Sequence, residues 1–319
     1  MRHFLYRLAA VSLVGLAAAC SGGTTQDDTL VVFNAGSLAN PMRAALDTFA
    51  ARQHVRVQQE NAGSLETARK LTELHQIPDV IALADYEVFP NVLMRPPAYV
   101  SWYADFARNR MVLAYTDKSR FASAISGDNW WQVVQRPGVQ VGRADPNLDP
   151  NGYRTLLVMQ LAERYYHRPG LYDSLLAASP ARNMRPKEAD LVGILQAGEL
   201  DYIWSYESLA QAAKLRAVHL PQEIDLGDPS DTAQYAQAVV RVAGRTPRDT
   251  IVFQGQPIVY ALSIPTAAPH PALAGRFVAF LFSDEGRRVL RAARLDALDA
   301  PVVVGTGAPA AVTAAARAR

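Results

Sequence analysis

The chain of 319 residues contains a single cysteine, Cys20. A lone cysteine cannot form an intramolecular disulfide, and metal sites built on several cysteines are excluded. The sequence also lacks an apolar run of the roughly 20 residues that a membrane-spanning helix needs. The longest such run, from Leu8 to Ala19, has twelve residues, so a transmembrane span is not predicted.

Catalytic motifs are missing as well. There is no Gly-x-Ser-x-Gly, no His-Glu-x-x-His and no glycine-rich phosphate loop of the Walker or dinucleotide type. The histidines after Cys20 are scattered without ligand spacing: His54, His75, His167, His219 and His270. We therefore expect a protein that is not an enzyme. An exported hydrolase that uses Asp149 or Glu207 as a base is kept as an alternative.

The first twenty residues have the layout of an export signal. Arg2 and Arg7 precede the apolar run, which ends at Ala18-Ala19-Cys20. Small residues directly before a cysteine resemble the lipobox of bacterial lipoproteins, in which that cysteine is acylated. We predict a signal peptide over 1–19, a lipidated Cys20 and a flexible tether over 20–28. The alternative is an ordinary cleavage site beside an incidental cysteine.

An excess of charge of one sign is also absent. The whole chain has 32 basic and 30 acidic residues, and residues 1–19 contain two arginines and no acid, so the mature chain is balanced at 30 of each. A nucleic-acid-binding protein would show a basic excess or stripe. No nucleic-acid partner is therefore expected. The mature chain is longer than a single core usually supports, which favours two lobes.

Short apolar runs alternate with helical patterns along the chain. Strands are predicted at Leu30 to Phe33, Val55 to Val57, Val80 to Ala84, Met111 to Tyr115, Val139 to Val141, Tyr202 to Trp204 and Ile258 to Ile264. Helices are predicted at Thr155 to Tyr166, Ala189 to Gln196, Ala272 to Phe282 and Glu285 to Ala293. This alternation indicates an α/β architecture in which each lobe has a mainly parallel sheet flanked by helices. We place lobe 1 at 29–115 plus 258–305, lobe 2 at 116–257 and a flexible tail at 306–319.

The pentapeptide Asn-Ala-Gly-Ser-Leu occurs twice, at 34–38 and 61–65, each time between a predicted strand and helix. Glycine allows close backbone approach, serine supplies a hydroxyl donor, and a helix start offers unpaired N–H groups. Two such turns at the carboxyl ends of adjacent strands can converge on one anion. The alternative is that Ser37 and Ser64 are helix N-caps.

Two further segments follow predicted strands. Residues 149–154, Asp-Pro-Asn-Gly-Tyr-Arg, precede a predicted helix and are typical of a turn with an N-cap. Tyr206 and Glu207 follow the strand that ends near Trp204, where they could face a cleft. From the residues alone, a ligand role is the less favoured interpretation of either segment.

The ordered set of segments resembles the archaeal-type tungstate/molybdate-binding proteins, the WtpA group related to ModA, within the periplasmic solute-binding proteins. The resemblance covers roughly residues 29–297. The matching segments are Phe33-Asn34-Ala35-Gly36-Ser37-Leu38, Ala84-Asp85-Tyr86, Phe106 to Ser119, Asp149 to Arg154, Arg185-Pro186-Lys187-Glu188, Leu200-Asp201-Tyr202, Leu220-Pro221 and Pro257-Ile258-Val259-Tyr260.

This resemblance implies the two-lobed type II periplasmic-binding-protein fold, with a two-strand hinge and a ligand cleft between the lobes. It implies that Ser37 and Ser64 bind the oxyanion from lobe 1, while Asp149 and the cleft tyrosine Tyr206 bind it from lobe 2. Some members also bring carboxylates to the metal of the oxyanion, which makes Asp149 and Glu207 candidate metal ligands. The family pattern has glutamate immediately before the tyrosine, where this chain has Ser205. Either Glu207 replaces that carboxylate, or Ser205 donates a hydrogen bond instead.

The function implied is that of an extracytoplasmic lipoprotein that captures tungstate or molybdate and delivers it to the permease of an ABC importer. We expect a monomer in the periplasm that is held at the membrane only by its lipid anchor. No cofactor is expected beyond the tungstate or molybdate ligand. The alternatives are a sulfate, thiosulfate or phosphate receptor on the same fold, or a structural lipoprotein.

Overall fold

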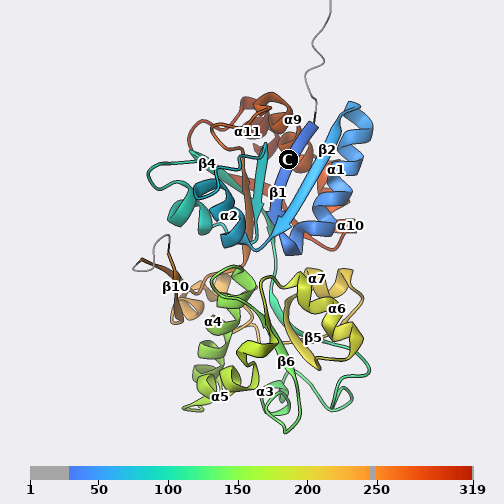
Figure 1. The fold of residues 1–319 in the computed structure, drawn as a ribbon, viewed down its shortest axis with the longest axis vertical. Helices are drawn as coiled ribbons and strands as arrows, with labels where there is room; N and C mark the ends of the chain where they lie inside the picture. The colour runs from blue at the N-terminus through green and yellow to red at the C-terminus, as the bar shows by residue number, and fades with distance from the viewer. Residues whose placement is uncertain (1–28, 245–248, 318–319) are drawn as a thin grey trace, which may run out of the picture.

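The computed structural model describes residues 29–244 and 249–317. The predicted signal peptide, the lipidated Cys20 and the tether lie outside these residues. The described chain forms two α/β lobes stacked along the long axis of the molecule (Figure 1). Within residues 29–244 and 249–317, no helix combines the length and the apolar character needed to cross a membrane.

Lobe 1 contains a six-stranded sheet in the order β13-β4-β12-β3-β1-β2. Its strands are β1 (Thr29–Ala35), β2 (Arg56–Ala62), β3 (Val80–Leu83), β4 (Trp102–Arg108), β12 (Val259–Ser263) and β13 (Asp296–Gly305). Its helices are η1 (Gly36–Leu38), α1 (Ala39–Gln53), α2 (Ser64–Thr72), η2 (Phe89–Leu93), α9 (Pro271–Phe282), α10 (Asp284–Ala292) and α11 (Ala310–Arg317).

Lobe 2 contains a five-stranded sheet in the order β7-β6-β8-β5-β9 and a separate hairpin of β10 and β11. The strands are β5 (Met111–Tyr115), β6 (Val141–Ala144), β7 (Met184–Arg185), β8 (Tyr202–Tyr206), β9 (Arg216–His219), β10 (Val239–Ala243) and β11 (Thr250–Gln254). The helices are α3 (Trp130–Val133), α4 (Pro150–Tyr165), α5 (Leu171–Ala178), η3 (Ala181–Asn183), α6 (Ala189–Ala197), α7 (Glu207–Ala212), η4 (Pro229–Asp231) and α8 (Thr232–Tyr235).

The two lobes and their α/β class agree with the sequence, but the sheets are mixed and not mainly parallel. In lobe 1, β1 is parallel to β2 and β3, whereas β12 is antiparallel to both β3 and β4. In lobe 2, β6 is parallel to β7 and β8, whereas β5 is antiparallel to β8 and β9. The mixed direction follows from the way the chain passes between the lobes. A strand that arrives from the other lobe enters its sheet at the hinge end and therefore runs opposite to the first strands of that sheet.

The predicted lobe boundary at residue 115 is wrong. Met111–Tyr115 forms the predicted strand, but this strand pairs with β8 and β9 in the lobe 2 sheet. The first crossing therefore lies at Asn109 and Arg110, directly after β4. On the return, the backbone N–H of Ile258 donates to the Leu226 carbonyl at 2.8 Å, and β12 of the lobe 1 sheet begins at the next residue.

The predicted flexible tail at 306–319 is also corrected. Residues 310–317 form α11, which packs against α9 and β13. Alanine is the strongest helix former, and Val312 and Ala316, four residues apart, lie on one face of the helix. Both side chains are buried. The segment therefore completes the lobe 1 core.

Candidate functional site

The two Asn-Ala-Gly-Ser-Leu segments lie side by side in lobe 1. β1 and β2 are parallel, with Asn34 opposite Asn61, and the Asn34 side-chain amide donates to the Asn61 side-chain oxygen at 2.7 Å. Each strand ends at its glycine-serine turn, so Ser37 and Ser64 follow neighbouring strand ends. Neither serine is a helix N-cap, because Ala35 and Gly63 occupy those positions. The structure therefore does not support the capping interpretation.

Both serine hydroxyls are buried and accept a hydrogen bond from the protein. Ser37 Oγ accepts from the Tyr260 hydroxyl at 3.0 Å, and Ser64 Oγ accepts from the backbone N–H of Ala84 at 3.0 Å. A hydroxyl has one proton and two lone pairs. Because the recorded bond at each serine uses a lone pair, the serine proton is left to donate to a ligand.

The Ser37 hydroxyl is the end of a chain of hydrogen bonds from the hinge. The Asn109 side-chain amide donates to the Tyr260 hydroxyl at 2.9 Å, and Tyr260 in turn donates to Ser37. Both side chains are buried. Successive hydrogen bonds polarise one another at low dielectric, which strengthens the last donor in the chain.

Asp149 begins α4 in lobe 2 and is buried. Its Oδ1 accepts from the backbone N–H of Asn151 at 2.8 Å, and its Oδ2 accepts from the backbone N–H of Glu188 at 3.1 Å. It is thus the N-cap that its turn sequence indicates. Burial raises the pKa of Asp149 to about 6, although the two backbone hydrogen bonds act in the opposite direction.

The lobes contact one another at this point, so the cleft is closed. The Leu148 carbonyl accepts from the backbone N–H groups of Leu65 at 3.1 Å and Glu66 at 3.2 Å, at the start of α2. Arg69 Nη1 also donates to the Asn147 carbonyl at 2.9 Å. The turn before Asp149 therefore lies directly against the Ser64 turn.

Tyr206 ends β8 and is fully buried. Its hydroxyl accepts from Arg154 Nη1 at 2.8 Å, so this hydroxyl, like the two serines, has a proton left to donate. Ser205, also buried, donates to Glu188 Oε1 at 2.6 Å. These placements leave the predicted ligand roles of Tyr206 and Ser205 open to test.

The structure does not bring Glu207 into this group. Its carboxylate lies 3.4 Å from Arg110 Nε and 3.7 Å from His219 Nδ1, and its side chain is 26% exposed. Tyr206 is the last residue of a strand and Glu207 the first of a helix, so the two side chains point in different directions. Glu207 lines a separate cavity of ≈ 550 Å³ at the hinge, together with Arg110.

Sequence reasoning missed Glu188 as a site residue. Glu188 is 1% exposed, and its Oε1 accepts from both Ser205 Oγ and the Tyr206 backbone N–H, each at 2.6 Å. Burial and the neighbouring Asp149 carboxyl raise its pKa well above the usual range. The matching segment Arg185 to Glu188 contained it, but no local pattern distinguished this glutamate from a solvent-exposed one.

Arg154 was likewise not singled out, although it joins the lobes. Its Nη2 lies 3.1 Å from Asp85 Oδ2 of lobe 1, with the two side chains 4% and 5% exposed. Its Nη1 donates to the Ala84 carbonyl at 2.6 Å as well as to the Tyr206 hydroxyl. Tyr153 also donates to Asp85 Oδ2, at 2.5 Å. Burial acts to lower the pKa of Arg154, but the nearby Asp85 carboxyl and the Tyr206 and Tyr153 hydroxyls together raise it.

A third carboxyl, Asp105 on β4, lies near Asp85 but has no such partner. Its Oδ1 is buried and makes no hydrogen bond within the described residues. Burial, followed by the Asp85 charge, raises its pKa to about 7.

We expect Asp105→Asn to be more stable than the wild type at pH 8, by about 1–3 kcal/mol. The unfolded carboxyl has a pKa of about 3.9, so its ionisation costs the folded state progressively more as the pH rises from 4 to 7, and the full cost applies above 7. The gain should therefore shrink toward pH 4. Urea unfolding at both ends of this range measures it, with Asp128→Asn on the exposed surface as control. An equal gain at all pH values would contradict the assignment.

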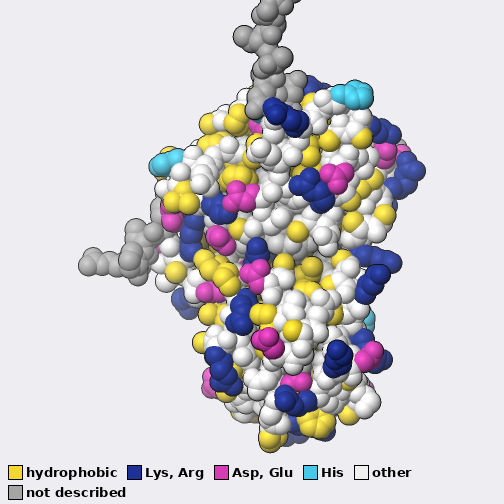
Figure 2. Space-filling view, turned by 45° about the vertical axis from the view of Figure 1, so that its right-hand side comes forward, with side chains coloured by type: hydrophobic (Ala, Val, Ile, Leu, Met, Phe, Trp, Pro, Cys, Tyr) yellow, Lys and Arg dark blue, Asp and Glu magenta, His cyan; other side chains and the backbone are white. Residues whose placement is uncertain are grey.

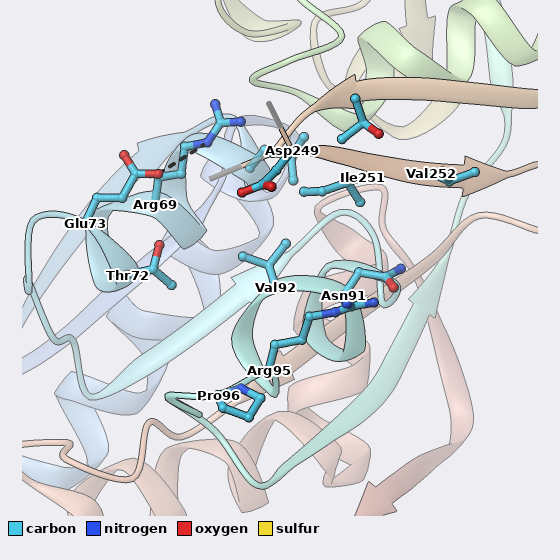
Figure 3. Close-up of a pocket in the computed structure, with 13 residues that line it drawn as sticks. Arg69, Thr72, Glu73, Asn91, Val92, Arg95, Pro96, Asp249, Ile251 and Val252 are labelled. Atoms are coloured by element: carbon cyan, nitrogen blue, oxygen red, sulfur yellow. Dashed lines mark ion pairs between the residues drawn. The ribbon is translucent and has the colours of Figure 1, made fainter. Parts of the chain in front are cut away.

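A further cavity lies outside this group of residues. It measures ≈ 670 Å³ and is lined by α2, η2 and the β10–β11 hairpin. Figure 3 shows Arg69 of α2 and Glu73, directly after α2, on one side of it and Ile251 and Val252 of β11 on another. On the face drawn in Figure 2, basic and acidic side chains are interspersed and form no large patch of one sign.

The arrangement suits an acceptor-only anion. Three buried hydroxyls, those of Ser37, Ser64 and Tyr206, each accept one bond from the protein and retain a proton. No group of three or more histidine, cysteine, aspartate or glutamate side chains within residues 29–244 and 249–317 is placed to hold a metal ion. These hydroxyls can donate hydrogen bonds to a ligand, and the carboxyls of Asp149 and Glu188 lie beside them.

Comparison with known proteins gives the same picture. Residues 30–293 match the bacterial extracellular solute-binding protein family. The chain belongs to this family. An uncharacterised solute-binding protein of Petrotoga mobilis is 43% identical over 262 residues, which is 82% of this chain and 81% of that protein. The molybdate/tungstate-binding protein WtpA of Thermococcus kodakarensis is 33% identical over 343 aligned positions, covering 96% of this chain and 94% of WtpA.

The fold is shared more widely. The solved periplasmic molybdate-binding protein of Azotobacter vinelandii has a TM-score of 0.61 at 16% identity, covering 83% of this chain and 98% of that one. The expected relationship to tungstate/molybdate-binding proteins and the two-lobed solute-binding fold are confirmed. This bacterial extracellular solute-binding family consists of binding proteins and not enzymes, so the chain is a solute-binding protein.

Proposed function

We propose that this solute-binding protein captures tungstate or molybdate between its lobes and delivers it to the permease of an ABC importer. In this proposal the protein is a monomer that works in the periplasm, anchored to the membrane through a lipid on Cys20. No other cofactor takes part.

The observation that supports this ligand class most directly is the set of three buried hydroxyls with a free proton. A tetrahedral dianion has four oxygens that only accept hydrogen bonds. Neutral donors in a cleft that excludes water match it without a bound counter-ion, and each bond to a charged group contributes about 1.5–3 kcal/mol. The donors come from both lobes, so the ligand holds the cleft closed.

The carboxyl of Asp149, with a pKa of about 6, is ionised at pH 7 and favours metal oxyanions over sulfate. An ionised carboxyl near the ligand repels an ordinary oxyanion, which is a penalty that a selective site uses against the wrong guest. The named relative WtpA supports the same ligands for this chain.

We expect tungstate and molybdate to saturate the purified mature protein and sulfate to produce little response. Calorimetry gives the affinities. Intrinsic fluorescence reports closure, because Trp204 lies two residues before Tyr206 in β8 and is buried. Equal affinity for all three anions would instead indicate a general oxyanion receptor.

Replacing Ser37 or Ser64 by alanine should weaken tungstate and molybdate binding by roughly tenfold to a hundredfold each, the value of one charge-assisted hydrogen bond. Ser123→Ala, at an exposed position with no recorded side-chain bond, is the matched control. If both site variants bind as well as this control in a folded sample, the proposed site is wrong.

A further inference from the structure

The side chain of Arg69 reaches from lobe 1 to two separate segments of lobe 2. Arg69 lies in α2, and its Nη1 donates to the Asn147 carbonyl at 2.9 Å while its Nη2 donates to the Ala243 carbonyl at 2.8 Å. Asn147 lies in the turn between β6 and α4, and Ala243 is the last residue of β10. One guanidinium therefore joins α2 to both the turn that precedes Asp149 and the β10–β11 hairpin.

The β10–β11 hairpin is fixed to the helix α4 of its own lobe. The Gln160 side chain of α4 donates to the Val239 carbonyl and accepts from the Val239 backbone N–H, each at 3.0 Å. The ring of Phe253 in β11 stacks on that of Tyr153 in α4, with centroids 4.3 Å apart. The hairpin should therefore move with α4 when the lobes separate, so its bond to Arg69 breaks on opening.

The two carbonyls that Arg69 contacts are held at a fixed spacing. Asn147 Oδ1 accepts from the Ala243 backbone N–H at 2.9 Å, and the Asn147 backbone N–H donates to Asp145 Oδ1 at 2.8 Å. A planar guanidinium presents its donors in a rigid fork, so it suits two acceptors whose positions are set in advance. Next to these bonds, a cavity of ≈ 670 Å³ separates α2 and η2 from the hairpin (Figure 3).

These bonds stabilise the closed form of the protein relative to the open form. Each has a charged donor, which strengthens it, and the Arg69 side chain is only 22% exposed, so water competes in part. The bonds form after a ligand has entered the open cleft and must break before it can leave. Such contacts change the dissociation rate far more than the association rate.

Building on the proposed function, we propose that Arg69 is a positioning residue that holds the Asn147 turn and the β10–β11 hairpin against α2 and thereby slows the release of bound tungstate or molybdate. It does so without touching the ligand. The same helix begins at Ser64, so Arg69 also keeps the Ser64 turn in place against the turn of Asp149.

The test is a separation of the two rate constants in Arg69→Met. Methionine is unbranched like arginine but cannot donate to either carbonyl. In stopped-flow fluorescence, tungstate should dissociate roughly tenfold to a hundredfold faster, which corresponds to charge-assisted bonds partly replaced by bonds to water. The association rate and the melting temperature of the ligand-free protein should stay near the wild-type values. Lys70→Met removes a neighbouring cation whose recorded partner, Glu60, belongs to lobe 1, and this control should change neither rate.

Two results would overturn the proposal. One is a dissociation rate in Arg69→Met equal to that of Lys70→Met, including the case in which only the melting temperature falls, because Arg69 would then be structural. The other is a loss of affinity that comes from slower association. Either result leaves the proposed function intact if the wild type binds tungstate. If the wild type binds neither tungstate nor molybdate, the proposed function fails, and this inference fails with it.

Discussion

Replacing Gly63 by alanine is expected to abolish tight ligand binding while leaving the fold intact. The Gly63 backbone has φ −63° and ψ 148°, which any residue adopts, so alanine causes no local strain. Its Cβ, however, would lie 2.2 Å from the Leu148 carbonyl oxygen of lobe 2. That carbonyl is held by the N–H groups of Leu65 and Glu66 and cannot turn aside. The clash exists only when the lobes are closed.

Gly63→Ala is expected to lower the affinity for the ligand on the order of a thousandfold, because apparent affinity falls with the fraction of molecules that can close. Calorimetry with tungstate or molybdate measures it, and small-angle scattering should show that ligand no longer compacts the variant. Gly193→Ala, in α6 with open space around the added Cβ, is the control. Melting temperatures of both variants should stay near that of the wild type. Normal binding by Gly63→Ala would show that the bound state does not bring these two turns into contact.

The sequence could predict the parts of the candidate site that depend on short local motifs. The repeated Asn-Ala-Gly-Ser-Leu turn gave Ser37 and Ser64 because parallel neighbouring strands end at the same edge of a sheet. The turn before α4 predicted the N-cap that Asp149 forms, whereas its ligand role was implied only by the family resemblance. Both signals depend on residues close together in the chain.

Glu188 and Arg154 could not be found in this way. Glu188 meets Ser205 and Tyr206 across seventeen or eighteen residues, and Arg154 meets Asp85 across the interlobe boundary. Such contacts depend on how α6, α4 and β8 pack, which no residue pattern records. Glu207, chosen for its position beside Tyr206, illustrates the error: sequence neighbours at a strand–helix junction point to different places.

The same limit explains the errors in the fold. Met111–Tyr115 was recognised as a strand from its apolar residues, but apolar residues do not say which sheet a strand joins. Its pairing with β8 and β9 sets the hinge at Asn109, the residue that begins the hydrogen-bond chain through Tyr260 to Ser37. With the lobe boundary corrected to Asn109, the hinge is linked by hydrogen bonds to Ser37 of the candidate site.

Replacing Arg154 by methionine is expected to produce the largest loss among the interlobe contacts. The substitution leaves the buried Asp85 carboxyl with neutral partners alone, the Tyr153 hydroxyl and the backbone N–H of Glu87. Removing one member of a buried ion pair costs about 3–5 kcal/mol. Because Asp85 belongs to lobe 1 and Arg154 to lobe 2, this cost falls mainly on closure. Affinity for tungstate or molybdate should drop by roughly a hundredfold to several thousandfold.

A double variant separates the ion pair from the other contacts of Arg154. In Asp85→Asn with Arg154→Met, the uncompensated charge is gone, and replacing both members of a buried pair is often close to neutral. Stability and closure should then recover substantially. Affinity should recover only in part, because the double variant still lacks the hydrogen bond from Arg154 to the Tyr206 hydroxyl. That bond occupies a lone pair of the hydroxyl and so directs its proton to the ligand. If Arg154→Met alone binds like the wild type, the Asp85–Arg154 pair has no part in closure. If the double variant is no better than the single one, the loss of affinity comes from packing and not from the uncompensated charge of buried Asp85.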